Sequence, residues 1–486
     1  MYISELVVRN FKSFGADHPP LSFNVPNGDL GSGLNIFLGE NNTGKSTIFE
    51  AFDFLRNKTN KPSTSIVNRA TPDAEASIEL VFCGDIDSVI EEFSPTPKKA
   101  AFRERVYSID DVEHIRFKRT SEEKNPIVIW HPENEEFTNV SGIDAPIKSM
   151  FETNFVWADT NPNDETKFGA STVTGNLLGE ILNNFTSHEQ YEAFIEQYDT
   201  TFNSPDSSLK QQLETIERTI QELFENQFGA GSIRFQFDQV SPKDFFKNVK
   251  VYVNDGTETS IEDKGSGMQR AVALAMLQVY ADIVKNQPEG DILKPLFLFI
   301  DEPEICLHPK AQERLFNALL ELSRTSQIFI TTHSPYFLTN RAMENMALFI
   351  CRSGENGPEV SNLAAGGLFP WSPTWGEINY LAYDMPTVDL HNELYGRLQE
   401  LTEHWSIPRF DNYLVEQGIQ KNKQWREERG GVPREPYDVT LMTFIRHKIH
   451  HPENATMQGQ EYTQDELRSS IESMIALLNQ IENGEE

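Results

Sequence analysis

The chain has few cysteines and no long apolar run. Its 486 residues include three cysteines, Cys83, Cys306 and Cys351, whose wide separation excludes a disulfide framework or a cysteine-rich zinc site and suits a reducing compartment. No stretch approaches the roughly 20 consecutive apolar residues of a membrane-spanning helix. Residues 1–15 alternate like a strand and lack the apolar centre of a secretory signal. We therefore expect a cytoplasmic protein with no membrane partner.

Positive charge is also scarce. The chain carries 42 Lys and Arg against 74 Asp and Glu, which gives a formal net charge of −32. Because DNA binding needs positive charge against the phosphates, this balance argues against a surface that serves as a whole for nucleic acid, although it leaves room for a local basic groove. An acidic balance is also ordinary for soluble bacterial proteins. The length is enough for two or three domains with a sizeable core.

A glycine-rich motif follows a short apolar segment. Residues 39–47 read GENNTGKST, which matches the pattern G-x-x-x-x-G-K-[ST] of a phosphate-binding P-loop. Residues 34–38 (LNIFL) predict a buried strand before it and residues 46–55 a helix after it, which is the context this motif requires. Lys45 would pair with the β- and γ-phosphates, and Ser46 would bind Mg²⁺. The predicted ATP-binding residues here are Gly39, Asn41, Asn42, Thr43, Gly44, Lys45, Ser46 and Thr47.

A second apolar segment ends in two acids. Residues 296–302 read LFLFIDE, so Asp301 and Glu302 follow a predicted buried strand directly. Asp301 would hold the Mg²⁺ shell together with Ser46, and Glu302 would polarise the water that attacks the γ-phosphate. Such a pair is often a solvated strand end, but the P-loop in the same chain favours the catalytic interpretation. The two motifs together predict ATP and Mg²⁺ as cofactors.

Two further segments resemble parts of ABC-type ATPases. Residues 264–277 (KGSGMQRAVALAML) form a Gly-Ser-Gly turn before an apolar helix and resemble the signature loop, which implies that Ser266, Gly267 and Gln269 face the nucleotide of a second protomer. Residues 328–338 (IFITTHSPYFL) resemble the strand that ends at the switch histidine, which implies that His333 contacts the γ-phosphate. Simple helix capping by Ser266 and a structural role for His333 are the alternatives.

The segments NFKSF, GENNTGKST, GSGMQR, FIDEPEICLHP and TTHSPYF, in this order, resemble the SMC/RecF/OLD branch of ABC-type ATPases over roughly residues 1–365. The resemblance implies an α/β fold with mixed sheets. It also implies that ATP lies between two protomers, so that hydrolysis requires a homodimer or a higher homo-oligomer. Arg9 and Lys12, beside the first strand, lie where members of this branch often contact the nucleotide. The glutamine loop of these enzymes has no evident counterpart.

The sequence departs from the longer members of this branch. It has no apolar repeat long enough for the arms of SMC proteins. Its tail has no D-x-D pair of a Toprim nuclease. Residues 412–421 (NYLVEQGIQK) resemble the first Toprim strand only weakly. The chain is more similar to short OLD-like ATPases, such as the PtuA-like and AriA-like subunits of the Septu and PARIS antiphage systems. That resemblance implies an effector nuclease or toxin encoded nearby as the partner, with DNA or a phage component as a further candidate.

The rest of the chain divides into a strand-rich part and a helical part. Predicted strands cover residues 77–83, 127–130, 232–238, 248–253, 340–353 and 358–364, and the polar residues 132–170 are predicted loops. Residues 187–230 are a predicted helical insertion with an apolar stripe made by Leu213, Ile216, Ile220, Leu223 and Phe224; a stalk or hairpin and a helix packed on the body are both open. We expect an ATPase head over residues 1–365 and an α-helical C-terminal domain over residues 366–486, with helices that include 410–420, 437–450 and 465–482.

A basic segment in the tail offers a second possible chemistry. Residues 444–454 (FIRHKIHHPEN) place Arg446 and His451 in the spacing R-x4-H, which resembles the catalytic motif of HEPN ribonucleases. An Arg and a His there would stabilise and protonate groups around a scissile phosphate. The alternative is a basic helix end that is favourable for the helix field and stops before Pro452.

The combined prediction is an ATP-binding and hydrolysing ABC-type ATPase. We expect it to assemble around ATP and to hold or gate an effector nuclease or toxin in bacterial antiphage defence. A RecF-like DNA repair ATPase and an ATPase-controlled HEPN-type RNase are the alternatives.

Overall fold

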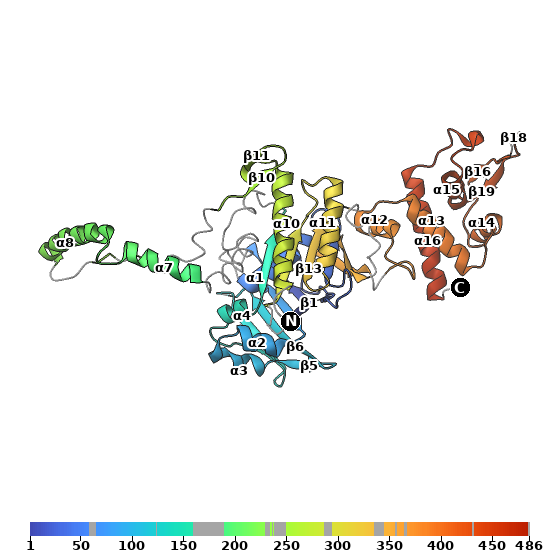
Figure 1. Cartoon of the computed structure of the whole chain (residues 1–486). Helices are drawn as coiled ribbons and strands as arrows, with labels where there is room; N and C mark the ends of the chain where they lie inside the picture. The colour runs from blue at the N-terminus through green and yellow to red at the C-terminus, as the bar shows by residue number, and fades with distance from the viewer. Residues whose placement is uncertain are drawn as a thin grey trace. The chain divides into compact units, whose positions relative to one another are not determined.

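The computed structural model (Figure 1) contains two compact units. Unit 1 comprises Met1–Thr153, Ile292–Glu304 and Gln312–Glu486, and unit 2 comprises Asn154–Asp291 and Ile305–Ala311. The structure describes the chain apart from residues 58–64, 123, 159–188, 229–233, 236, 238–248, 286–293, 335–344, 355–356, 364–366, 430–431 and 485–486.

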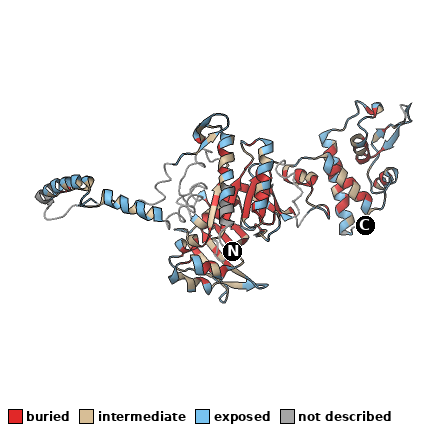
Figure 2. Ribbon diagram, in the orientation of Figure 1, coloured by how far each residue is buried: buried red, intermediate tan, exposed pale blue. Residues whose placement is uncertain are grey.

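The central sheet of unit 1 places the ends of three buried strands side by side. Five of its six strands, β15 (Gly357–Asn362), β14 (Ala347–Gly354), β3 (Leu34–Leu38), β13 (Gln327–Thr332) and β12 (Leu296–Asp301), lie in this order, and β9 (Glu152–Val156) follows β12. Among these five strands, all neighbours are parallel except β15, which is antiparallel to β14. Every residue of β3, β12 and β13 is buried, as expected of parallel strands covered on both faces (Figure 2). The carboxyl ends of these three strands therefore meet at one edge.

A second sheet in unit 1 is antiparallel. It contains β2 (Leu21–Ser22), β1 (Tyr2–Arg9), β4 (Ser77–Cys83), β6 (Val112–Thr120), β7 (Ile127–His131) and β8 (Glu136–Thr138) in this order, with β5 (Tyr107–Ile109) paired to β6. Helices α1 (Lys45–Asn57), α2 (Ile86–Phe93), α3 (Thr96–Arg103) and α11 (Pro309–Leu322) accompany the strands. The apolar positions of α1 fall at helical spacing, and Phe49 and Phe52 pack on Phe299 with ring centroids 5.3 and 4.8 Å apart. This packing fixes α1 directly behind the end of β3.

The prediction of loops over residues 132–170 is wrong for its described part. Residues 132–158 contain β8, helix α4 (Asp144–Met150) and β9 (Glu152–Val156), while residues 159–170 lie outside the described residues. Helix α4 buries Ile147 and Met150, and Asp144 pairs with the fully buried guanidinium of Arg119. Tertiary packing thus supplies the order that the polar sequence does not suggest.

Unit 2 holds the predicted helical insertion and the Gly-Ser-Gly segment. Helices α7 (Glu189–Phe202) and α8 (Ser208–Phe228) occupy the segment predicted to be helical. The side chains of Ile216, Ile220 and Phe224 on the apolar stripe are exposed. The unit also contains β10 (Tyr252–Asn254), β11 (Glu258–Ser260), the 3-10 turn η2 (Ile261–Asp263) and α10 (Ser266–Lys285).

Two strand predictions in unit 2 need correction. Arg234, Phe235 and Phe237 are described and lie in no strand, while the rest of segment 232–238 lies outside the described residues. Within 248–253, the strand begins at Tyr252 and runs to Asn254, because the turn at Gly256, with φ +121°, sets up a short hairpin of β10 with β11. The hairpin turn, which the apolar pattern did not reveal, decides where this strand lies.

The C-terminal part of unit 1 is mainly helical and has a hydrophobic cluster of its own. Its helices are α12 (Trp375–Tyr383), α13 (Val388–Leu401), α14 (Ile407–Glu416), α15 (Leu441–His450) and α16 (Gln464–Asn483), with the 3-10 turn η6 (Ala455–Met457). Buried residues from Phe369 to Leu478 form one hydrophobic cluster. This cluster supports our proposal of a helical domain over residues 366–486, although the ATPase strands belong to the same compact unit.

The prediction of an α-helical domain for this part misses two small hairpins. Strand β16 (Lys423–Trp425) pairs with β19 (Tyr437–Val439), and β17 (Glu428–Arg429) pairs with β18 (Val432–Pro433). The segment predicted as a helix over 437–450 therefore starts as a strand, and the helix begins only after Thr440, whose side chain accepts the N–H of Thr443. The helix predicted over 410–420 ends at Glu416, shortly before Gly418 with φ +87°.

A buried histidine should make the stability of this cluster depend on pH. His391 on α13 is 0% exposed, and its Nε2 lies 3.1 Å from Ser470 Oγ. Burial, with smaller contributions from Arg446 and His450, lowers the pKa of His391 from 6.5 to about 3. The unfolded chain then binds one more proton than the folded chain between these values. The free energy of unfolding should therefore fall as the pH falls below 6.5, by up to about 1.4 kcal/mol per pH unit.

The measurement is urea unfolding of the wild type and of His391→Asn at pH 7, 6 and 5. Asn can still hydrogen-bond Ser470 but does not titrate, so the variant should lose less unfolding free energy between pH 7 and pH 5. His447, whose pKa burial lowers to about 4, is present in both proteins and cancels in the comparison. Equal pH dependence of the two proteins would contradict the assignment to His391.

Candidate functional site

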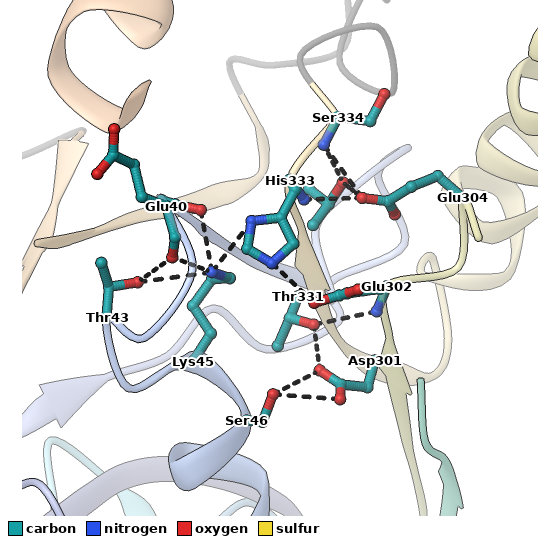
Figure 3. A network of polar contacts seen from close by, with 12 residues as sticks. Glu40, Thr43, Lys45, Ser46, Asp301, Glu302, Glu304, Thr331, His333 and Ser334 are labelled. Atoms are coloured by element: carbon teal, nitrogen blue, oxygen red, sulfur yellow. Dashed lines mark hydrogen bonds and ion pairs between the residues drawn. The ribbon is translucent and has the colours of Figure 1, made fainter. Parts of the chain in front are cut away.

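The loop of residues 39–44 packs closely against β14 and β15. Figure 3 shows Glu40 and Thr43 of this loop beside Lys45. Gly39 and Gly44 have φ of +151° and +88°, which side chains rarely tolerate. A Cβ on Gly39 would lie 2.1 Å from the carbonyl oxygen of Cys351, and one on Gly44 would lie 2.7 Å from Cγ of Pro358. The two glycines are therefore required by the backbone path as well as by the close approach of neighbouring strands.

Lys45, the first residue of α1, is buried inside this loop. Its Nζ donates to the carbonyl oxygens of Gly39 at 2.9 Å and Glu40 at 2.7 Å, and lies 3.4 Å from Nδ1 of His333. Burial lowers the pKa of Lys45, against the raising influence of nearby groups that include Glu302. A desolvated ammonium among loop carbonyls is suited to exchange these neutral partners for phosphate oxygens.

Ser46 and Asp301 form the part of the site that fits Mg²⁺. Ser46 Oγ donates to Oδ1 and Oδ2 of Asp301 at 3.1 and 3.2 Å, and Thr331 Oγ1 also donates to Asp301 Oδ1. These are hard oxygen ligands of the kind that Mg²⁺ prefers. In the part of the chain that the structure describes, no cluster of three His, Cys, Asp or Glu could hold a metal alone. The ion would therefore take its other ligands from phosphates and water.

The backbone of Glu302 has a left-handed conformation, and its side chain contacts His333. Its φ is +47°, a conformation that costs energy for a non-glycine residue and clusters at functional sites. The backbone N–H of Glu302 donates to the carbonyl oxygen and to Oγ1 of Thr331, both at 3.1 Å. Its Oε1 lies 2.7 Å from Nε2 of His333. Because Lys45 can only donate, Nδ1 of His333 accepts and Nε2 donates, so the imidazole links the ammonium to the carboxylate.

The structure adds two residues that the sequence interpretation missed. Thr331 joins Asp301 to the backbone of Glu302, as described above. Glu304 accepts three hydrogen bonds from the residues at the end of β13. Their positions in the sequence could have indicated them. Each lies at or just after the end of a buried strand, close in sequence to residues that were already candidates.

Three of the remaining candidates near the loop, Thr43, Arg9 and Lys12, have protein partners. Thr43 Oγ1 donates to the carbonyl oxygen of Glu40 at 2.8 Å, which closes the loop. The guanidinium of Arg9 donates to the carbonyl of His18, and Lys12 pairs with Glu50 on α1. Asn41 and Asn42 are exposed, with Asn42 at φ +64°, and Thr47 is half-buried. The nucleotide contacts of Arg9 and Lys12 remain predictions.

The signature candidates lie in unit 2. Ser266 is the first residue of α10. A Cβ on Gly267 would lie 2.4 Å from the carbonyl oxygen of Cys306, so this position accepts no larger residue without movement. Gln269 donates to three backbone carbonyls, those of Ile261, Glu262 and Lys264, at 3.0–3.2 Å. Gln269 therefore holds the turn before α10, and its role in a second protomer remains a prediction.

Arg446 and His451 have separate partners. The Arg446 Nη1 donates to Oδ1 of Asn392 at 3.1 Å, and the guanidinium lies 4.8 Å from the ring centroid of Tyr395. His451 is half-exposed, and its Nδ1 lies 3.3 Å from a carboxylate oxygen of Glu453. These contacts fit the structural alternative and lend the ribonuclease interpretation no support.

Comparison with protein families bears on the site directly. The family model described as AAA ATPase domain matches residues 1–338, well over half of the 486 residues. The chain belongs to this AAA ATPase domain family. ATP binding and hydrolysis, predicted from the P-loop and the acid pair, are thereby confirmed as its activity, and the expected α/β P-loop fold with mixed sheets is confirmed as well. In the described part of the ATPase, no helix has the length and apolar character to cross a membrane.

The ATPase is similar to two proteins that are named as nucleases, one of which comes from a phage. It is 25% identical over 336 residues to the Old nuclease of Escherichia phage P2, covering 66% of this chain and 56% of the relative. It is 24% identical over 377 residues to the endonuclease GajA of Bacillus cereus (strain VD045), covering 73% of this chain and 59% of the relative. This chain therefore spans less than two thirds of the length of either relative.

Solved SMC head domains are more distant. An SMC head bound to the C-terminal winged-helix domain of ScpA has a TM-score of 0.45 at 19% identity, covering 75% of this chain and 98% of that chain. An SMC head from Pyrococcus yayanosii with a coiled coil and joint has a TM-score of 0.46 at 14% identity, covering 79% and 99%.

Proposed function

We propose that this ATPase binds ATP with Mg²⁺ between two protomers and, in that assembled state, holds or gates an effector nuclease or toxin in antiphage defence. The observation that carries the proposal is the network of Lys45, Ser46, Asp301, Glu302 and His333 at one edge of the sheet. The similarity to the Old nuclease and to GajA supports the association with a nuclease.

The arrangement suits an in-line attack of water on the γ-phosphate. The loop N–H groups and Lys45 would hold the phosphates, and Ser46 with Asp301 would hold Mg²⁺, which neutralises charge on the phosphate oxygens. Glu302 would accept a proton from the attacking water. His333, now hydrogen-bonded to Glu302, would turn its Nε2–H toward the γ-phosphate. Ser266 and Gly267 of a second protomer would complete the site, as the resemblance to ABC-type enzymes implies.

Affinity purification of the tagged protein from a host with the native locus, with ATP and Mg²⁺ present, tests the proposal. Mass spectrometry should identify a nuclease or toxin subunit with the wild type, and much less of it with Lys45→Ala. Recovery of the protein alone would favour one of the two alternatives. ATP-dependent DNA binding by the purified protein would then support the repair ATPase, and RNA cleavage that His451→Ala abolishes would support the RNase.

A further inference from the structure

Glu304 lies in the turn that follows β12, two residues after the proposed catalytic acid. One oxygen of its carboxylate, Oε1, accepts three hydrogen bonds: from Thr332 Oγ1 at 2.7 Å, from the backbone N–H of His333 at 2.7 Å and from the backbone N–H of Ser334 at 3.1 Å. Hydrogen bonds to an ionised carboxylate are shorter and roughly twice as strong as neutral ones. A single side chain thus contacts three consecutive residues; Figure 3 labels Glu304 with two of them, His333 and Ser334.

These three residues are those with which β13 leaves the sheet. Strand β13 ends at Thr332, so the N–H groups of His333 and Ser334 have lost the ladder as a source of acceptors. Backbone N–H groups in half-buried positions require another acceptor. Glu304 provides it for His333, while the N–H of Ser334 is shared between Glu304 and Thr332 Oγ1, which lies 3.0 Å away. The direction in which the chain leaves the sheet is therefore set by Glu304 from the neighbouring strand.

The side chain of His333 depends on this direction. Its imidazole lies between Glu302 Oε1, at 2.7 Å from Nε2, and Lys45 Nζ, at 3.4 Å from Nδ1. Both contacts require the Cα of His333 to stay where the backbone bond to Glu304 holds it. A displacement of about 1 Å at such a position can cost a catalytic step about 100-fold.

We propose that Glu304 is a positioning residue for ATP hydrolysis, which acts by holding the backbone of His333 so that the imidazole stays within reach of Glu302 and, when ATP is bound, of the γ-phosphate. Glu304 touches neither the nucleotide nor the attacking water in this arrangement. The inference rests on the role given to His333 in the proposed function.

The replacement Glu304→Ala removes all three hydrogen bonds and should lower kcat by about 10- to 100-fold. The KM for ATP should stay within about twofold, because Lys45 and the P-loop glycines are unchanged. In Glu304→Gln the amide oxygen can accept the same three donors, so kcat should return to within about threefold of the wild type. Glu304→Asp keeps the charge but is one methylene shorter, and it should fall between these two variants. A role in folding alone would not separate kcat from KM in this way.

Steady-state ATPase assays of these variants and of His333→Ala, together with their thermal unfolding temperatures, test the inference. If Glu304→Ala does not fold, the kcat values of the Asp and Gln variants decide between the outcomes. Wild-type kcat in Glu304→Ala or Glu304→Asp, or a loss in Glu304→Gln as large as in the other two, would overturn the inference. If His333→Ala lowers kcat while Glu304→Ala does not, the role of Glu304 fails and the proposed site stands. Wild-type kcat in His333→Ala would overturn the role of His333 and this inference with it.

Discussion

Lys45→Ala is expected to weaken ATP binding strongly and, with it, ATP turnover. The ammonium is buried within the P-loop and has the carbonyl oxygens of Gly39 and Glu40 as partners, which phosphate oxygens would replace. Removing one member of a buried, hydrogen-bonded charge pair costs about 2–5 kcal/mol, which corresponds to roughly 30- to 5,000-fold weaker binding. Isothermal titration calorimetry with a non-hydrolysable ATP analogue measures this loss directly.

A matched lysine variant and a stability measurement make the result interpretable. Lys99 pairs with the exposed Glu91, away from the loop, so Lys99→Ala should bind the analogue like the wild type. Lys45→Ala should unfold in the wild-type temperature range without nucleotide, but ATP should no longer raise its unfolding temperature. Wild-type affinity in Lys45→Ala would contradict the placement of the phosphates in this loop.

Glu302→Gln is expected to bind ATP with wild-type affinity and to hydrolyse it about 100- to 10,000-fold more slowly. An amide oxygen can still accept a hydrogen bond from Nε2 of His333, but the amide cannot accept a proton from water. ATP should consequently remain bound, and any oligomer that forms around ATP should persist. Single-turnover hydrolysis assays and sedimentation in the presence of ATP measure the two effects.

The control for this variant is Glu313→Gln, because Glu313 is an exposed residue on α11. It should keep wild-type hydrolysis. If Glu302→Gln hydrolyses ATP at the normal rate, another group accepts the proton and the assignment of Glu302 is wrong.

The parts of the site that could be predicted from the sequence are local ones. The segment LNIFL, which was predicted to be a buried strand, is β3 and is buried at all five positions. The motif after it specifies both the loop and the start of α1. This helix begins at Lys45, one residue before the predicted start. Asp301 could be assigned because an acid after five buried apolar residues marks a strand end. In each case the relevant neighbours lie within a few residues along the chain.

The parts that could not be predicted depend on distant partners. Glu304 acquires its role through the parallel register of β12 and β13, which places Asp301 opposite Thr331. This register brings Thr332 and the residues after it beside the turn that contains Glu304. Strands β16 to β19 have two or three residues each, too few to show alternation. The glycine motif itself does not indicate that β14 and β15 pack on the P-loop glycines.

The chain passes from unit 1 to unit 2 close to the proposed catalytic acid. The chain leaves unit 1 after Glu304 and returns at Gln312, so the crossing begins two residues after the proposed catalytic acid. Glu302 and Cys306, on either side of the crossing, both have left-handed φ values, +47° and +65°. On the far side, the carbonyl of Cys306 meets the start of α10 at Gly267. The backbone that carries the proposed catalytic acid thus continues, between Glu302 and Cys306, into the unit that contains the signature candidates.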